Sequence, residues 1–402
     1  MSEEKKVGFV TMGEATEVEE IPTLKIGILG YAFMGKSHSN AYLKQNYIIW
    51  PPAAKAELYA ICGRNEEAVK VAAKRYGYKK YYTNWKDLVS DPEVDIFDNS
   101  GPNNLHYEAS IEAIKNGKHV FCEKPLALNA QQGKELFLAA EEKGVKHMVD
   151  FNYRFVPAVR LAKEIVESGE IGEIYHFRAQ YLQEWIIDPN FPLVWRLRKD
   201  VAGSGALGDL GAHIIDMARF LVGEFASVMA QMKTFIKERP LPDNPDKKGT
   251  VDVDDAFAAV VEFENGALGT LEASRFCHGR KNYQYWEING SKGSIRFNLE
   301  RLNELEVYLA KEGEPKLIGA RDIMVTESFH PFMEHWWPHG HIIGWEHAQV
   351  HAVYHFLDCV VNNKSVEPYG ASFRDGYRSL VVEEGIAESA QTGQRVFLKY
   401  EV

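Results

Sequence analysis

The sequence has no pair of cysteines at the spacing of a metal-binding or redox site. Its four cysteines are scattered along 402 residues, a usage typical of reduced thiols in a cytoplasmic protein. They are Cys62, Cys122, Cys277 and Cys359. No apolar run approaches the roughly 20 residues that cross a bilayer. The first 20 residues hold six glutamates and two lysines without the apolar core of a secretory signal, so we expect a cytoplasmic protein and no membrane partner.

Dense clusters of basic residues are also missing. Lysine and arginine total 46 against 57 acidic residues, a formal net charge of −11, so nucleic acid is not an expected partner. A chain of this length exceeds one typical hydrophobic core and predicts two domains. We place them at 24–150 and 151–402, after an N-terminal extension at 1–23. That extension is either a flexible arm or a strand lying on a neighbouring subunit.

A glycine-rich turn follows the first apolar run. Residues 24–29 predict a buried parallel strand, and Gly30-Tyr31-Ala32-Phe33-Met34-Gly35 leads into a helix expected over 36–44. This is the Gly-x-Gly-x-x-Gly pattern of dinucleotide-binding folds, with Ala32 at the second glycine position. Glycines there let the backbone approach a pyrophosphate at the positive end of the helix. Taken alone, the pattern also fits a simple tight turn.

The elements that follow alternate between strand and helix. Strands are predicted at 57–62, 94–99, 119–123 and 147–151, and helices at 66–76, 111–116 and 134–143. Short loops between them predict a doubly wound parallel sheet with right-handed crossovers. Ligands of such sheets bind at the carboxyl ends of the strands. The loops of interest therefore follow Leu29, Cys62, Asn99, Glu123 and Phe151.

The loop after the second strand bears on the choice of cofactor. An acidic residue there binds the ribose hydroxyls of NAD, whereas an arginine accommodates the extra phosphate of NADP. The chain has Gly63-Arg64-Asn65 and no carboxylate before Glu66, which favours NADP. Arg64 could equally be a solvated residue at the start of the helix, stacking on the adenine.

Lys124 ends the strand predicted at 119–123, in the sequence Glu123-Lys124-Pro125. There it would lie in the ligand crevice, where burial and a neighbouring cation lower a lysine pKa and where it could hydrogen-bond a reacting hydroxyl. A single lysine is more often an exposed turn residue. A cis or rigid peptide before Pro125 would instead hold the side chain in one pose.

A second glycine-rich segment, Gly203 to His213, leads into an apolar stretch at 214–222. It carries Asp209 and His213 four residues apart, which on a helix puts them on one face, about 6 Å apart. A carboxylate beside an imidazole can handle a proton. The pair could instead be an N-cap aspartate and a histidine satisfied by packing.

From residue 174 onward, consecutive strands replace the alternation. We predict strands at 174–182, 226–237, 256–264, 267–275, 283–289, 294–298 and 305–309, with a hairpin turn at Asn265-Gly266. The predicted fold class is an α/β dinucleotide-binding domain plus an α+β domain with a large, mostly antiparallel open sheet. One face of that sheet can meet helices and the other a second subunit, so we expect a homodimer or homotetramer formed through it.

Five motifs in this order give the chain a resemblance to a known family. They are Gly30 to Gly35, Pro102-Asn103-Asn104-Leu105-His106, Glu123-Lys124-Pro125, Asn152-Tyr153-Arg154 and Gly208 to His213. On these motifs, residues 24–400 resemble the glucose-fructose oxidoreductase, inositol dehydrogenase and rhizopine-catabolism (Gfo/Idh/MocA) family. The stretches at 181–185, 195–196 and 203–213 are most similar to its levoglucosan dehydrogenase branch, followed by the inositol dehydrogenases.

The resemblance implies a Rossmann domain that binds NAD(P). Gly30, Ala32, Phe33, Met34 and Gly35 would line the pyrophosphate, Pro102, Asn103 and His106 the nicotinamide side, and Glu123 and Lys124 the nicotinamide ribose and the substrate hydroxyl. Lys124, Asp209 and His213 would then face the substrate carbon. In that arrangement His213 would be the general base, Lys124 would stabilise alkoxide charge, and Asp209 would orient the imidazole or a neighbouring hydroxyl.

Aromatic residues suggest the substrate side of the pocket. Trp185 and Trp195 bracket a loop containing two prolines, and either could stack on the apolar face of a sugar. Tyr153, Gln183 and Arg196 could then bond its hydroxyls. We expect most other tryptophans of this half to be core residues.

Residues 330–355 are rich in histidine, and the resemblance places this loop near the sugar. We expect His335 and His347 on the pocket wall. A metal site is the alternative, but the His-Glu-x-x-His motif is missing and hydride transfer needs no metal, so none is expected.

These features predict an NAD(P)-dependent dehydrogenase acting on a secondary hydroxyl of a neutral sugar, anhydrosugar or cyclitol. The main alternative is a glycoside hydrolase or lyase that keeps NAD bound and uses transient oxidation to drive elimination. A cofactor-binding regulator without turnover is a third possibility, which the joint presence of Lys124, Asp209 and His213 argues against.

Overall fold

The computed structural model describes residues 20–310 and 314–402. The segment before residue 20, for which an arm or a strand on a neighbouring subunit was expected, lies outside the described residues. None of the helices in the described ranges is both long and apolar enough to cross a bilayer.

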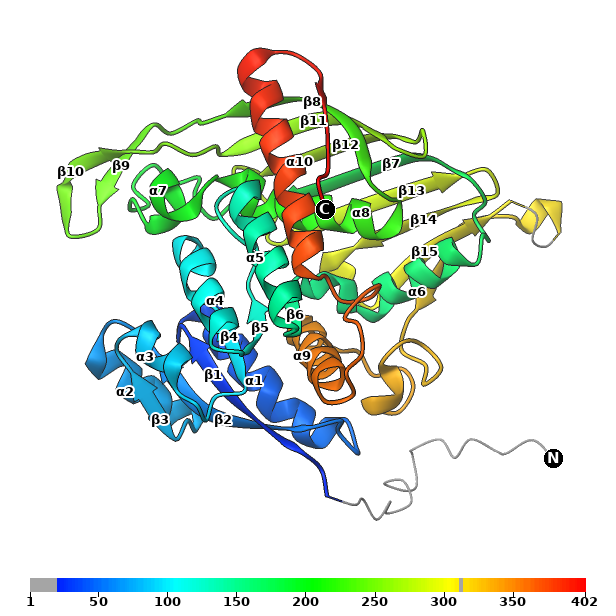
Figure 1. Ribbon diagram of the computed structural model, residues 1–402. Helices are drawn as coiled ribbons and strands as arrows, with labels where there is room; N and C mark the ends of the chain where they lie inside the picture. Colours follow the sequence, from blue (N-terminus) through cyan, green and yellow to red (C-terminus); the bar gives the residue numbers. More distant parts are fainter. Residues whose placement is uncertain (1–19, 311–313) are drawn as a thin grey trace, which may run out of the picture.

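The N-terminal part forms the predicted parallel sheet, with strand order β3-β2-β1-β4-β5-β6 (Figure 1). Its strands are β1 (Thr23–Leu29), β2 (Lys55–Cys62), β3 (Lys80–Tyr82), β4 (Ile96–Asn99), β5 (His119–Cys122) and β6 (His147–Val149). The helices between them are α1 (Phe33–Ile48), α2 (Glu66–Tyr76), α3 (Trp85–Ser90), α4 (His106–Lys115) and α5 (Ala130–Lys143). The sequence did not predict the short elements β3 and α3. The strand order reverses between β1 and β4, the position at which such sheets bind their ligands.

Two helices from the far end of the chain complete the layers around this sheet. They are α9 (Trp345–Val361) and α10 (Phe373–Thr392), which pack against α1 and α5 respectively. Neighbouring β5 side chains point to opposite layers: Phe121 packs in one hydrophobic cluster with α9, and Val120 in another with α10. Because α9 and α10 serve both halves, the domain division at residue 150 stays a prediction.

The later strands form a nine-stranded sheet of order β16-β15-β14-β13-β7-β12-β11-β8-β17. All neighbours pair antiparallel except β7 with β12, which confirms a mostly antiparallel open sheet. The strands are β7 (Ile174–Leu182), β8 (Phe225–Lys233), β11 (Ala256–Phe263), β12 (Leu268–Ser274), β13 (Tyr283–Gly290), β14 (Gly293–Asn298), β15 (Glu304–Leu309), β16 (Arg321–Met324) and β17 (Val396–Phe397). A hairpin of β9 (Glu238–Leu241) and β10 (Asn244–Thr250) extends beyond this sheet (Figure 1).

Strand β8 ends at Lys233, earlier than the predicted residue 237. The buried Asp255 carboxylate accepts from the amides of Phe235 and Ile236 over 2.7 and 3.3 Å. A side chain therefore satisfies the backbone donors that a longer strand would have paired.

Among the described residues, helices cover only one face of the nine-stranded sheet. Helices α6 (Pro157–Glu167), α8 (Ala212–Leu221) and α10 share its hydrophobic cluster. On the other face Met229, Val260 and Leu268 remain 51–54% exposed. An open sheet with apolar residues on its free face is the arrangement from which an oligomer was predicted.

Candidate active site

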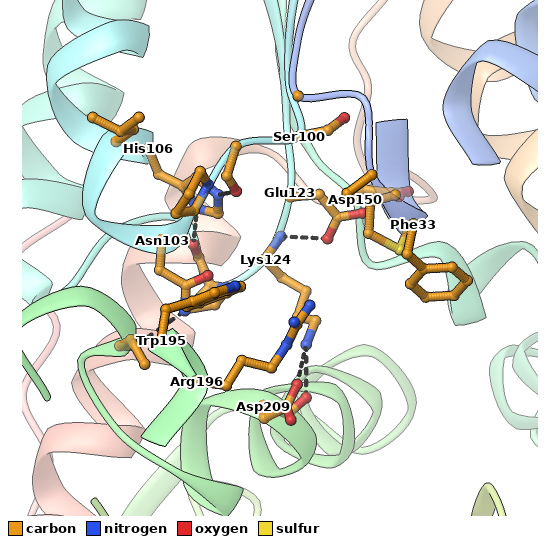
Figure 2. A pocket seen from close by; sticks show the side chains of 18 of the residues that line it. Phe33, Ser100, Asn103, His106, Glu123, Lys124, Asp150, Trp195, Arg196 and Asp209 are labelled. Atoms are coloured by element: carbon orange, nitrogen blue, oxygen red, sulfur yellow. Dashed lines mark hydrogen bonds and ion pairs between the residues drawn. The ribbon is translucent and has the colours of Figure 1, made fainter. Parts of the chain in front are cut away.

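A cavity of about 1230 Å³ lies where the carboxyl ends of the first sheet face the second sheet, and Figure 2 shows it from close by. It is lined by most of the residues predicted from the sequence. These are Gly30, Ala32, Phe33, Met34, Arg64, Pro102, Asn103, His106, Glu123, Lys124, Tyr153, Gln183, Trp185, Arg196, Asp209 and His213. The loops after β1, β2, β4, β5 and β6 all contribute, as the rule for doubly wound sheets predicts.

The two glycines of the first turn stand where a side chain would have no room. Gly30 has φ +104°, and a Cβ on it would lie 2.5 Å from the Ser100 carbonyl oxygen. A Cβ on Gly35 would lie 2.2 Å from the Gly30 carbonyl oxygen, so Gly35 sits behind the turn and lets α1 pack against it. No side chain caps the start of α1 at Ala32. Its first amides are therefore available to an anion, as a pyrophosphate requires.

Packing explains why residue 63 is a glycine. A Cβ there would lie 2.0 Å from the ring of Tyr31, which covers the loop after β2. An acidic residue at this position would therefore displace Tyr31. Arg64 is exposed on the cavity lining, where no ion pair within the described residues occupies its guanidinium.

Asn103 and His106 are engaged by the loops around them. Asn103 donates to the Ala202 carbonyl over 3.0 Å, and the buried His106 ring places its two nitrogens 2.6 and 3.1 Å from the carbonyls of Pro125 and Gly101. Both side chains therefore tie together loops that line the predicted nicotinamide side.

Lys124 and Asp209 meet in the cavity, although 85 residues separate them. The Lys124 ammonium donates to the Asp209 carbonyl oxygen over 2.6 Å and lies 3.5 Å from its carboxylate (Figure 2). The Lys124–Pro125 peptide is cis, one of the two forms predicted. Burial favours the neutral acid, but Lys124 and Arg275 outweigh it and hold the pKa of Asp209 below its usual value.

The second glycine segment is held by a buried carboxylate. Asp254 accepts from the amides of Gly205 and Leu207 over 2.7 and 2.8 Å. A Cβ on Gly205 would lie 1.7 Å from the Asp254 carbonyl oxygen, so only glycine fits. Beyond this clamp, Leu207–Gly211 forms a π-helical turn rather than the first turn of a regular helix.

Asp209 and His213 both line the cavity, but the partners of Asp209 are other residues. Asp209 faces Lys124 and the fully buried Arg275, whose guanidinium is 3.7 Å from its carboxylate. Within the described residues no hydrogen bond joins Asp209 to His213, so the expected orientation of the imidazole by this carboxylate is not seen.

The ring of His213 packs among aromatic rings. It lies 4.7 Å from the Tyr153 ring and 5.8 Å from that of Tyr181. Neither nitrogen is hydrogen-bonded to a described residue, and the side chain lines the cavity. Burial, followed by the charge of Lys124, lowers the pKa of His213 well below its ordinary value. The imidazole is therefore neutral at ordinary pH and free to accept a proton.

The wall of the cavity includes a buried group of charges that sequence reasoning missed as a group. His38 of α1 has Nδ1 2.9 Å from Asp98 at the end of β4, and Nε2 3.0 Å from Glu123 and 3.1 Å from Asp150. Burial alone would lower the pKa of His38, but the three carboxylates raise it well above its ordinary value. An imidazolium in their midst balances part of their charge and fixes Glu123 next to Lys124.

Donor atoms of His38, Glu123 and Asp150 lie within 4.8 Å of one another, a spacing that metal ligands share. Here the positive charge is carried by the imidazolium itself, because both ring nitrogens face carboxylate oxygens at hydrogen-bond distance. The group is thus explained as a buried ion-pair cluster.

The histidine-rich loop does not bring His335 or His347 to the cavity. His347 caps the start of α9 by accepting from the Gly344 amide, and its ring packs 4.2 Å from that of Trp336. His335 packs against Tyr354 on the same side. From this segment it is Trp345 that lines the cavity.

Comparisons with known proteins agree with this geometry. Residues 24–151 match the family described as an oxidoreductase family with an NAD-binding Rossmann fold, and residues 159–296 match the GFO/IDH/MocA C-terminal domain. A levoglucosan dehydrogenase of Pseudarthrobacter phenanthrenivorans is 42% identical over 91% of this chain and 96% of its own length. A myo-inositol 2-dehydrogenase of Thermotoga maritima is 32% identical over 72% of this chain and 79% of its own.

Solved structures show the same relation. A levoglucosan dehydrogenase in complex with NADH and L-sorbose superposes with a TM-score of 0.91 at 42% identity, over 94% of this chain and all of that one. An NAD-binding oxidoreductase from Klebsiella pneumoniae gives 0.88 at 36% identity, over 94% of this chain and 99% of that one. With two family domains matched in order and the glycine turn, Lys124 and Asp209 in one cavity, the chain belongs to the Gfo/Idh/MocA family of NAD-binding oxidoreductases.

Proposed function

We propose that this protein is a dehydrogenase that oxidises a secondary hydroxyl of a neutral sugar, anhydrosugar or cyclitol, with Lys124, Asp209 and His213 around the reacting carbon. The observation that carries the proposal is the shared cavity. It holds the dinucleotide turn, the Lys124–Asp209 pair and a neutral, unbonded His213. The relatives named above, levoglucosan and myo-inositol dehydrogenases, support the substrate class.

Each residue has a distinct role in this proposal. His213 accepts the hydroxyl proton, since its imidazole is neutral and free. Lys124 stabilises the negative charge that develops on the oxygen, and Asp209 fixes the ammonium through its carbonyl and carboxylate. The nicotinamide of a dinucleotide held by the loops at Gly30, Arg64 and Pro102 supplies the hydride acceptor.

The substrate side of the cavity is lined by aromatic residues, with the Arg196 guanidinium beside them. Trp195 and Arg196 are stacked with the guanidinium 4.3 Å from the ring centre, and Trp185 packs edge-on against Phe191. Arg275 is already engaged by Asp209. The aromatic rings support binding of a polyol with one apolar face, to which Arg196 can donate hydrogen bonds.

A panel assay tests the function. We expect absorbance of reduced nicotinamide to appear with levoglucosan, other anhydrosugars or inositols, and not with sugar phosphates, when each cofactor is supplied separately. Release of an aglycone from a glycoside without net cofactor reduction would instead support redox-assisted elimination. No change with any sugar would contradict both.

We also propose that Arg64 lets the enzyme accept NADP, although the solved levoglucosan dehydrogenase named above holds NADH. The exposed guanidinium beside the side-chain-free Gly63 suits a 2′-phosphate. Replacing Arg64 with serine should weaken NADPH binding about tenfold and NADH binding little, because a bond to a charged group is lost only with the former. Titration by fluorescence measures both. Lys74→Ser, at the other end of α2, is the charge-matched control, and equal losses for both cofactors would argue against this role.

The uncovered face of the nine-stranded sheet supports a further proposal, that two copies pair through it as a homodimer or within a homotetramer. Apolar side chains on β8, β11 and β12 would be buried there. Light scattering on the full chain measures the assembly. The four cysteines are free thiols, which suits the cytoplasm that we propose as its compartment.

A further inference from the structure

Hydrogen bonds along one wall of the cavity run in a single direction. Trp345 Nε1 donates to the Tyr153 hydroxyl over 3.3 Å, and the hydroxyls of Tyr153 and Tyr181 are 2.9 Å apart. The Tyr181 hydroxyl donates to Asn282 Oδ1 over 2.7 Å. Because a tyrosine has one O–H, Tyr181 must accept from Tyr153. The chain of donors therefore ends on the side-chain oxygen of Asn282.

Asn282 Oδ1 is saturated and its amide nitrogen is free. The oxygen also accepts from Gln183 Nε2 over 2.7 Å, which uses both of its lone pairs. In the described part of the chain, Asn282 Nδ2 and Gln183 Oε1 make no hydrogen bond, and both residues line the cavity. The two side chains thus offer N–H donors and a carbonyl acceptor next to each other.

Glu300 holds the loop that carries Asn282 in place, and Glu184 pairs with the charge of its lysine. The amides of Lys281 and Asn282 both donate to Glu300 Oε1, over 3.1 and 3.0 Å. The Lys281 ammonium is paired with Glu184, so it presents no uncompensated charge to the cavity. The backbone that carries Asn282 is therefore fixed in position, and the charge of the neighbouring Lys281 is compensated.

We infer that Asn282 and Gln183 form a subsite for a second hydroxyl group of the substrate, which makes Asn282 a specificity-determining residue. This inference rests on the proposed function. A hydroxyl both donates and accepts, so it can bond Gln183 Oε1 and Asn282 Nδ2 together. A carboxylate or phosphate oxygen accepts only and would face the Gln183 carbonyl without a proton to share. The subsite thus selects neutral polyols.

Two variants of Asn282 test the subsite. Asn282→Ala removes the donor, and Asn282→Asp keeps the oxygen that Tyr181 and Gln183 bond while turning the donor into a charged acceptor. Their KM for levoglucosan and myo-inositol, and calorimetric binding of levoglucosan to the NADH-loaded protein, are compared with wild type. We expect KM and the dissociation constant to rise about tenfold in Asn282→Ala and more in Asn282→Asp, with NADH affinity unchanged. Asn289→Asp, on the strand β13 that follows this loop and outside the cavity, is the matched control.

Single-deoxy analogues of levoglucosan identify the hydroxyl. Wild type should bind one analogue more weakly than levoglucosan, whereas Asn282→Ala should bind that analogue and levoglucosan equally. For each of the other analogues, the loss of affinity relative to levoglucosan should be the same in both proteins. A wild type that turns over the sugars while both variants stay within twofold of its KM would overturn the subsite and leave the proposed function standing. The subsite would be overturned in the same way if all analogues behaved alike. A wild type that neither oxidises nor binds any sugar would remove the proposed function and the subsite with it.

Discussion

Replacing His213 with asparagine is expected to lower kcat/KM by roughly two to four orders of magnitude, the usual worth of a general base. Asparagine can fill much of the space between Tyr153 and Tyr181 but cannot take a proton. Because neither ring nitrogen of His213 bonds a described residue, the loss should not propagate into the fold. NADH affinity and melting temperature should therefore stay close to wild type.

The pH profile separates a base from a packing residue at this position. Activity requires unprotonated His213 and falls as the pH drops through its pKa. Burial and the charge of Lys124 lower that pKa, so the acid limb of wild-type kcat/KM should lie well below pH 6.5. In His213→Asn, the residual activity should have no such limb. A variant that keeps both the rate and the limb would assign the proton transfer to another group.

The parts of the site that the sequence predicted are those set by local backbone chemistry. Gly30 must be glycine because of its positive φ and the close Ser100 carbonyl, and Gly205 because of Asp254. Such positions can be recognised in the sequence as glycine-rich segments. Lys124 could be placed because it follows the carboxyl end of a parallel strand, the edge of the sheet at which ligands bind.

Other parts depend on tertiary contacts that leave no periodic signal. His38 looks like any polar residue of α1, and its three carboxylate partners come from the ends of three separate strands. Asp98 and Asp150 each stand at a strand end, the one signal that could have found them. Asn282 precedes β13 in a loop held by Glu300, a contact that no spacing predicts.

One expectation was misled by helical periodicity. His347 recurs at helical spacing with other histidines, yet its partners are the Gly344 amide and Trp336. A histidine at regular spacing on a buried helix is thus a packing residue as readily as a ligand.

Replacing Lys124 with methionine is expected to lower kcat by about 10² to 10³, since the developing alkoxide loses its charged donor. Methionine keeps the length of the stem but loses the 2.6 Å bond to the Asp209 carbonyl. Lys115→Met, an exposed lysine of α4, is the control for the loss of one charge.

A second consequence distinguishes a catalytic lysine from a structural one. The charge of Lys124 is one of the two causes that lower the pKa of His213. Its removal should therefore move the acid limb of the residual activity to higher pH, while burial, the larger cause, keeps it below the ordinary histidine value. Stopped-flow rates across the pH range measure both effects. A fall in rate with an unmoved limb would mean that Lys124 and His213 do not act at one carbon, and the proposed arrangement of the site would fail.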